Sequence, residues 1–407
     1  MKVLLRAIYP YIYLLLFLTI PFDNYVRVLP NILMAALLAI FPFIVTRNDL
    51  TKLRKAPTIA FLIFLIYLVI NSLVFNRIDE DFVTIKKIGL AVGLAILYIP
   101  VQDRRKISLA IIFSSLAAIV FSIVKIVIII NVSEDIALGY SREVIEALLI
   151  DRLYLGMLSI LSVLVSYQAI TKRFHPNNQY HLINIIINVL FVFLMVSKIA
   201  IVVMGALFVI RLFYSKKKMF RVFAVIIAIA SATVLFVSIR NIDNNHASVT
   251  TVNPADRSFL ENTVTWELRT TVWKCGYQVA RAQGVIFEGL GFNETRESLI
   301  DCYENTIENN WKKNKYVEMG YNSHNQFIDL YLNYGLFALI LFVAFLLIAF
   351  VKCKKHYFAM AMLVTMVSYL LVENVFHRQI GAYYIGFILI VLLSRNFLGQ
   401  INSVKED

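Results

Sequence analysis

Residues 182–214 read LINIIINVLFVFLMVSKIAIVVMGALFVIRLFY, an apolar run of 33 residues in which Lys198 stands near the middle. An α-helix crosses the hydrocarbon core of a bilayer in about 20 residues, so this run is too long for one crossing. A charge in the middle of a single crossing would also lie at the bilayer centre, where charged side chains are costly. The run therefore predicts two short membrane-spanning helices with a tight turn at Lys198.

Apolar runs recur along nearly the whole chain. Of its 407 residues, 60% are hydrophobic and only 16% are charged, whereas soluble domains are about 45–50% apolar and about 25% charged. This composition excludes a water-soluble enzyme. We expect an all-α polytopic membrane protein with about twelve transmembrane helices, near residues 7–22, 28–46, 57–76, 87–101, 107–131, 153–171, 182–197, 199–214, 221–239, 334–351, 357–376 and 380–395.

Basic residues indicate the orientation. If the N-terminus is inside, the inner segments carry 21 Lys and Arg and four acidic residues, whereas the outer segments carry 17 and 21. Cytoplasmic loops of membrane proteins have an excess of Lys and Arg. We therefore expect both termini in the cytoplasm, and the net charge of +13 needs no nucleic-acid partner. The chain divides into residues 1–239 with nine helices, an outer loop at 240–333, and residues 334–407 with three helices and a short tail.

The outer loop is expected to be a mostly helical periplasmic cap that carries catalytic elements. It contains an amphipathic stretch from Phe259 to Gln283. It also contains Cys275 and Cys302, and an oxidising compartment permits a bond between them without requiring one. Outside this loop, the acidic run at 79–81 is expected to be a solvated turn.

The sharpest local feature is YNSHNQFIDLYLNYG at residues 321–335. Ser323 and Gln326 have the spacing of a capping box, which predicts a helix with His324 at its first position. The positive end of a helix disfavours the imidazolium form, so a neutral His324 is a candidate general base. A histidine that only caps a helix is the alternative interpretation of the same residues.

A second feature is a set of cations at the outer ends of spans, where the positive-inside rule gives no reason for them. Such cations usually have partners, and phosphate or pyrophosphate is their natural ligand. Pairing with nearby acids such as Asp151 and Glu373, or snorkelling of a lysine to the interface, is the alternative. The set comprises Arg142, Arg152, Lys198, Arg269 and Arg378.

Several enzyme classes are disfavoured by the motifs that the chain lacks. The sequence contains no P-loop, no glycine-rich dinucleotide turn, no HExxH and no Cys/His metal spacing. We therefore expect no metal site and no cofactor.

Taken together, the motifs resemble those of the O-antigen ligase/polymerase superfamily. The resemblance rests on the histidine motif after a large outer loop and on shorter elements, of which one has Lys198 where the family usually has Arg. These shorter elements are 151–156 (DRLYLG), 195–198 (MVSK), 266–273 (WELRTTVW), 289–292 (GLGF) and 373–381 (ENVFHRQIG).

The resemblance implies an inverting glycosyltransferase at the periplasmic face of the bacterial inner membrane. Its donor would be a glycan on undecaprenyl pyrophosphate, and it would use neither metal nor ATP. His324 would be the catalytic base. The expected pyrophosphate-binding residues are Arg152, Lys198 and Arg269, and the expected supporting residues are Glu373, Arg378 and Arg142.

Three functions remain open at this level. A ligase would transfer the glycan to lipid A–core, whereas a polymerase would transfer it to another lipid-linked repeat. The Glu…Arg-Gln-x-Gly ending at 373–381 favours the ligase. A flippase of lipid-linked glycan is the alternative of another class, but it would be expected to carry charges deep in many spans, and these spans hold few.

Overall fold

The computed structural model describes residues 2–101, 104–132, 148–171, 175–195, 197–215, 219, 222, 225, 267–282 and 287–393. Throughout these ranges the regular secondary structure is helical. Five helical segments are long and apolar enough to cross a membrane, and three shorter apolar helices accompany them. The expectation of a polytopic all-helical membrane protein is therefore confirmed. The ninth expected span, 221–239, falls almost wholly outside the described residues, so the count of about twelve spans stays a prediction.

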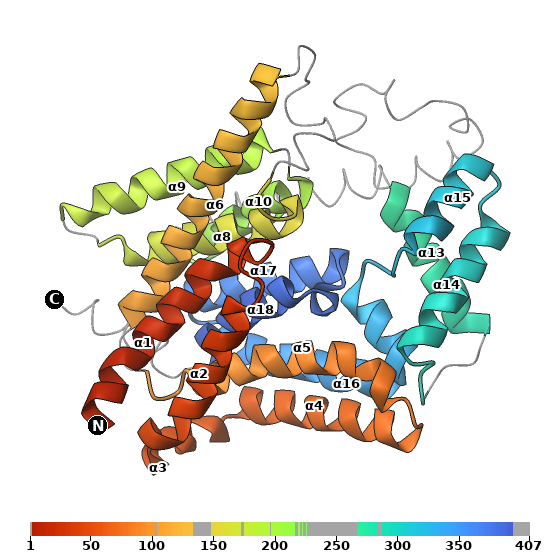
Figure 1. Ribbon diagram of the computed structural model, residues 1–407, viewed down its shortest axis with the longest axis horizontal. Coiled ribbons are helices and arrows are strands. Elements are labelled where there is room, and N and C mark those ends of the chain that lie inside the picture. Colours follow the sequence, from red (N-terminus) through yellow and green to blue (C-terminus); the bar gives the residue numbers. More distant parts are fainter. Residues whose placement is uncertain are drawn as a thin grey trace.

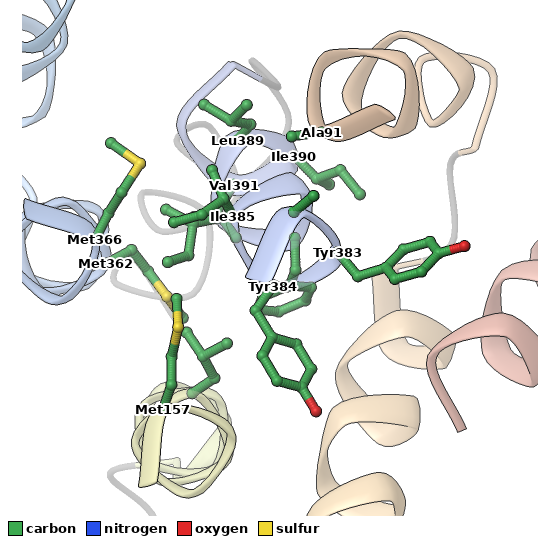
Figure 2. Close-up of a cluster of buried hydrophobic side chains, with 14 of the residues drawn as sticks. Ala91, Met157, Met362, Met366, Tyr383, Tyr384, Ile385, Leu389, Ile390 and Val391 are labelled. Carbon is green, nitrogen blue, oxygen red and sulfur yellow. The ribbon is translucent and has the colours of Figure 1, made fainter. Parts of the chain in front are cut away.

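The apolar helices pack as a bundle in which α4, α5 and α16 run side by side, whereas α1 and α6 run together in another direction (Figure 1). Among the described residues, α4 packs on α16, α5 on α18, α1 on α2 and α6, and α8 on α9. Figure 2 shows methionines of α8 and α17 facing α18 in the buried core. These helices are α1 (Lys2–Thr19), α2 (Leu29–Ile44), α4 (Ala56–Val74), α5 (Ile78–Leu97), α6 (Arg104–Val132), α8 (Arg152–Ala169), α9 (Asn177–Leu194), α10 (Lys198–Phe213), α16 (Gln326–Cys353), α17 (Tyr357–Val372) and α18 (Gln379–Leu393).

The short helices lie at the ends of the bundle or in the outer loop. Near the bundle ends are η1 (Ile20–Phe22), α3 (Arg47–Leu50), η2 (Thr51–Arg54) and η4 (Val375–His377). The outer loop contributes α13 (Glu267–Ala282), α14 (Phe292–Thr306) and α15 (Asn310–Met319). In Figure 1 these three helices gather at one end of α16, around a small core of their own that includes Val272, Leu299 and Tyr303.

A disulfide joins Cys275 of α13 to Cys302 of α14. The bond that the sequence left open is therefore present. It links two of the three helices of the cap, whose core is small.

The break in the long apolar run is confirmed. Helix α9 ends at Leu194 and α10 begins at Lys198, and the N–H of Ser197 bonds back to the carbonyl of Val192 at 3.3 Å. A glycine of α8 lies against this turn, because a Cβ on Gly156 would be 2.7 Å from Ser197 Oγ. The missing side chain lets α8 approach the turn closely.

The prediction of a solvated acidic turn at 79–81 was wrong for the loop and for Asp81, whereas Asp79 and Glu80 are exposed as predicted. These residues form the first turn of α5, where negative charge is favourable, and Asp81 is fully buried. Its carboxylate accepts hydrogen bonds from Ser72 Oγ at 2.6 Å and from the backbone N–H of Phe292 at 3.0 Å. Asp81 therefore connects α5 to the first residue of α14. This contact could not be predicted from the sequence, because the two residues are 211 positions apart.

Helix α16 is interrupted at Gly335, whose φ of 79° is positive. The segment 287–291 lies in this interruption. The N–H groups of Leu290 and Gly291 donate to the carbonyls of Leu332 and Asn333, at 2.7 and 3.0 Å. A Cβ on Gly335 would be only 2.3 Å from the carbonyl oxygen of Phe287. Only glycine fits here, and the outer loop is thereby fixed to the start of α16.

Candidate functional site

The segment that carries His324 differs from its sequence prediction. Helix α16 begins at Gln326, and its N-cap is Asn325, whose Oδ1 accepts from the N–H groups of Phe327 and Ile328 at 2.9 and 3.2 Å. The predicted capping box at Ser323 was wrong because Asn325 does the capping two residues later. His324 consequently lies just outside the helix and not at its first position.

The backbone of His324 is held in an unusual conformation. Its φ of 42° is positive, which is uncommon for a residue other than glycine. Its N–H donates to Asn322 Oδ1 at 3.0 Å, and the next N–H, of Asn325, donates to Asn374 Oδ1 at 2.7 Å. Residues kept in such conformations cluster at functional sites, where the surrounding structure enforces them. Two asparagines do so here.

The imidazole of His324 is oriented by a carboxylate. His324 Nδ1 lies 3.0 Å from Glu373 Oε2, and the two side chains are 18% and 14% exposed. Within the described part of the chain, the other ring nitrogen, Nε2, is buried and has no hydrogen-bond partner. When Nδ1 carries the proton and donates it to Glu373, Nε2 presents a lone pair. This arrangement suits a general base.

Glu373 is ionised at neutral pH for identifiable reasons. Burial by itself would raise the pKa of Glu373, but the hydrogen bond with His324 and the positive charges of Arg269 and Arg378 hold that pKa below its ordinary value. The carboxylate therefore sits beside several positive charges. An imidazolium formed at His324 would be stabilised by it.

Three of the predicted cations lie near one another, and one of them, Arg269, lies beside Glu373. Arg152 begins α8, Lys198 begins α10 and Arg269 belongs to α13, and electrostatic interactions link Arg152 with both of the others and Lys198 with Arg269. Arg269 Nε donates to the carbonyl of Val372 at 3.0 Å, immediately before Glu373. Burial lowers the pKa of Arg269, and the charge of Glu373 partly offsets this effect. Cations from three distant segments are thus brought to one place.

Arg378 and Arg142 are the two other cations that the sequence predicts for the site. Arg378 Nη1 lies 3.3 Å from Asp151 Oδ2 in an exposed pair, with 58% and 45% of the two side chains accessible. Arg378 therefore pairs with an acid, but with Asp151 and not with Glu373, its neighbour in the sequence, and exposed pairs stabilise little. Asp151 also caps α8, because its Oδ1 accepts from the N–H of Leu153 at 2.9 Å. Arg142 lies outside the described residues.

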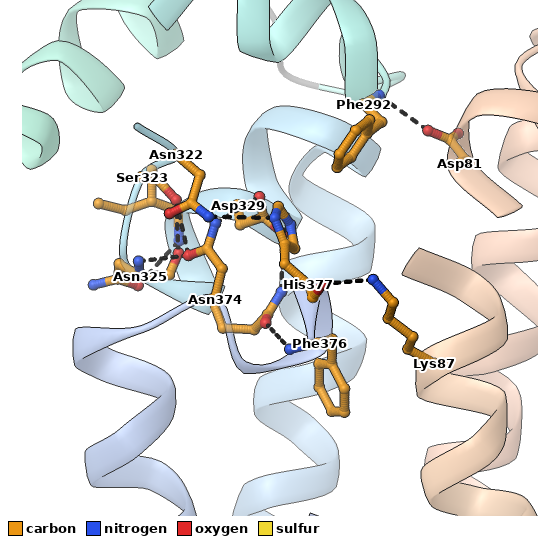
Figure 3. Close-up of polar contacts among 12 residues, drawn as sticks. Asp81, Lys87, Phe292, Asn322, Ser323, Asn325, Asp329, Asn374, Phe376 and His377 are labelled. Carbon is orange, nitrogen blue, oxygen red and sulfur yellow. Dashed lines mark hydrogen bonds and ion pairs between the residues drawn. The ribbon is translucent and has the colours of Figure 1, made fainter. Parts of the chain in front are cut away.

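A buried polar network supports the histidine segment (Figure 3). Asn374, which follows α17, links this segment to the histidine segment. Its Oδ1 accepts a hydrogen bond from Ser323 Oγ at 3.2 Å, and its Nδ2 donates one to Asp329 Oδ1 at 3.0 Å. Asp329 Oδ2 in turn accepts from Gln326 Nε2 at 2.9 Å and lies 3.0 Å from His377 Nε2.

Sequence reasoning missed Asn374, Asp329 and His377. The available signal was their position within the quoted motifs, where Asp329 lies one turn after the helix start and Asn374 follows Glu373. The partners that connect the two segments of this network are 45 to 51 residues apart along the chain. In the described ranges, no group of three His, Cys, Asp or Glu side chains is arranged to hold a metal ion.

Comparison with known proteins bears on the same region. Residues 183–343 match a protein-family model described as O-antigen ligase. The matched region includes Lys198, Arg269 and His324, whereas Arg152 and Glu373 lie outside it. No curated protein matches the chain. The family resemblance indicated by the sequence motifs is therefore confirmed.

Proposed function

On the premise that residues 183–343 belong to the O-antigen ligase family, we propose that the protein is a ligase-type glycosyltransferase. It moves a glycan from undecaprenyl pyrophosphate to lipid A–core at the periplasmic face of the bacterial inner membrane. The observation that carries this proposal is the His324–Glu373 pair, in which Nδ1 is held by a carboxylate and Nε2 is buried without a partner among the described residues.

In the proposed reaction, His324 Nε2 takes the proton of an acceptor hydroxyl as that oxygen bonds to the anomeric carbon. Productive proton transfer requires the oxygen to come within about 2.6–3.2 Å of the nitrogen. Glu373 keeps the imidazole in its productive tautomer and stabilises the imidazolium that forms. The hydrogen bond between this carboxylate and the imidazole is charge-assisted, and such bonds are about twice as strong as neutral ones.

The bond that breaks joins the anomeric carbon to a pyrophosphate oxygen, and its electron pair leaves with undecaprenyl pyrophosphate. Arg152, Lys198 and Arg269 are the proposed partners of this leaving group. Guanidinium groups match phosphate oxygens in bidentate fashion, and positive charge near a developing anion lowers the barrier to its departure. The acceptor attacks from the opposite side, so the transfer inverts the anomeric configuration.

Reconstitution tests the proposal directly. Purified protein in liposomes is given glycan-bearing undecaprenyl pyrophosphate and lipid A–core, and the mass of the glycolipid product is measured. Transfer by the wild type and its loss in His324→Ala supports a ligase. Joining of two lipid-linked repeats without lipid A–core identifies a polymerase. Movement of the donor between leaflets with no covalent product identifies a flippase and excludes the proposed chemistry.

A deletion strain provides a second assay. Loss of every glycan-capped lipid A–core species is expected for a ligase, whereas a cap of a single repeat is expected for a polymerase. Restoration of capping by the wild-type chain, and not by His324→Ala, ties the phenotype to the proposed base. Normal capping in the deletion strain would contradict the proposal.

A further inference from the structure

Tyr154 of α8 has an unexplained hydroxyl. The side chain is 2% exposed, and in the part of the chain that the structure describes its hydroxyl is buried without a hydrogen-bond partner. Burying a hydroxyl without a partner costs free energy, and such groups in folded proteins call for a specific explanation.

The surroundings of Tyr154 differ from those of Tyr384, another buried tyrosine of the bundle. Its side chain interacts electrostatically with Glu373, Arg378 and Asp151, and the guanidinium carbon of Arg378 lies 5.8 Å from the centre of its ring. Tyr384 of α18 is also fully buried with an unpartnered hydroxyl. Within the described ranges, however, no charged side chain interacts electrostatically with Tyr384.

Among the described residues, neither of the nearby carboxylates accepts a hydrogen bond from the Tyr154 hydroxyl. Glu373 is engaged by His324. Asp151 is engaged by the N–H of Leu153 and by Arg378. Among the described residues, Nη1 of Arg152, two residues before Tyr154, is likewise buried without a partner. Two hydrogen-bond donors at the start of α8 therefore lack an acceptor, and a ligand with several acceptor oxygens would satisfy both.

We propose that the Tyr154 hydroxyl and Arg152 Nη1 donate hydrogen bonds to phosphate oxygens of the bound lipid-linked pyrophosphate. This inference rests on the proposed function for the identity of the ligand. It adds Tyr154 to the binding site as a ligand contact whose ring also lies beneath the guanidinium of Arg378.

The test compares Tyr154→Phe with the matched control Tyr384→Phe. Each variant loses one buried, unpartnered hydroxyl and keeps its ring, so neither should lower the Tm. Binding of undecaprenyl pyrophosphate without glycan is measured in detergent micelles, with phosphatidylglycerol as a control phospholipid. A hydrogen bond to a charged group corresponds to about 10–100-fold in affinity. A loss of that size is expected for Tyr154→Phe and less than twofold for Tyr384→Phe, with phosphatidylglycerol binding unchanged in both.

Each alternative outcome has a distinct meaning. Wild-type affinity in Tyr154→Phe, at any Tm, overturns the inference, and so does an equal loss of phosphatidylglycerol binding. If the wild type binds undecaprenyl pyrophosphate but transfers no glycan, the proposed function fails, whereas the Tyr154 contact is still decided by the affinities. If the wild type does not bind this lipid, both proposals are overturned.

Discussion

His324 Nδ1 lies 3.0 Å from Glu373 Oε2 across 49 residues of sequence. Each residue is placed by a different helix boundary: His324 immediately precedes the N-cap of α16, and Glu373 is the C-cap of α17. Both are locally constrained, since Asn374 binds the N–H of Asn325 and Arg269 binds the carbonyl of Val372. The pair is thus held from both sides, which is the geometry that an orienting carboxylate requires.

Removing the base should abolish transfer. We expect His324→Ala to lower the transfer rate by about 10²–10⁴-fold, the usual contribution of a positioned general base, with donor affinity largely kept because the cations remain. His246, outside the described residues, is the control, and His246→Ala should lose much less. The measurement is initial rate against donor concentration. A near wild-type rate in His324→Ala would disprove the mechanism.

Neutralising the orienting carboxylate should reduce turnover and change the acid stability. Glu373→Gln keeps a polar side chain without the charge, and we expect kcat to fall by about 10–100-fold, as for the loss of a hydrogen bond to a charged group, with a smaller change in KM. Because the folded-state pKa of Glu373 is lowered, its carboxylate contributes stability above the unfolded-state pKa of about 4.3. That contribution is lost as the pH falls through the folded-state value.

The pH test compares thermal unfolding of the wild type and Glu373→Gln from pH 7 to pH 3. The wild type should be the more stable at neutral pH, and the difference in Tm should shrink below about pH 4.3. A difference that is independent of pH over this range would show that the carboxylate contributes no charge-dependent stability.

Glycan transfer should require a positive charge at position 198, but it should not require that the residue be lysine. Lys198→Arg keeps the positive charge, so activity should stay within a few-fold of the wild type. Lys198→Ala should lose most of the activity at unchanged expression, because Arg152 and Arg269 remain without their third cation. The assay is glycan transfer at saturating donor. Full activity of Lys198→Ala would indicate that the charge only anchors the helix at the interface.

The interruption of α16 should tolerate only glycine. Gly335→Ala places a Cβ 2.3 Å from the carbonyl oxygen of Phe287 at a φ of 79°, which should destabilise by more than the roughly 0.4–1 kcal/mol gained at a compatible site. Gly93 of α5 is the control, because a Cβ there meets nothing within 4 Å. Thermal unfolding should show a lower Tm for Gly335→Ala and an equal or higher one for Gly93→Ala. Equal Tm values in the two variants would contradict the close approach of the Phe287 carbonyl to Gly335.

The disulfide should stabilise the cap. Denatured, unreduced protein should contain one reactive thiol, that of Cys353, because Cys275 and Cys302 are bonded. Cys275→Ser with Cys302→Ser should cost the cap about 2–4 kcal/mol, seen as faster proteolysis within 267–325 than in the wild type. Three reactive thiols in freshly purified protein would rule out the bond.

The cation set shows how far local patterns reach. The sequence makes Arg152, Lys198 and Arg269 candidates because each is expected near the outer end of a span, where the positive-inside rule gives no reason for a cation. Their mutual proximity followed only from the packing of α8, α10 and α13. The histidine motif was similar: His324 was a candidate from its motif, whereas its orienting partner depended on where α17 ends.

The amino-acid sequence by itself determined the helices and the break at Lys198, because a chain in lipid must satisfy its backbone hydrogen bonds within each helix, and apolar run length then sets where a helix can cross. Tertiary structure alone decided that Asp81 is buried against α14, that Asn325 replaces Ser323 as the cap, and that Glu373 meets His324. The first and the third are contacts between polar groups of different helices, and Asn325 itself is held by Asn374, which follows α17. Their energies depend on the burial and geometry of both partners, which no local sequence pattern contains.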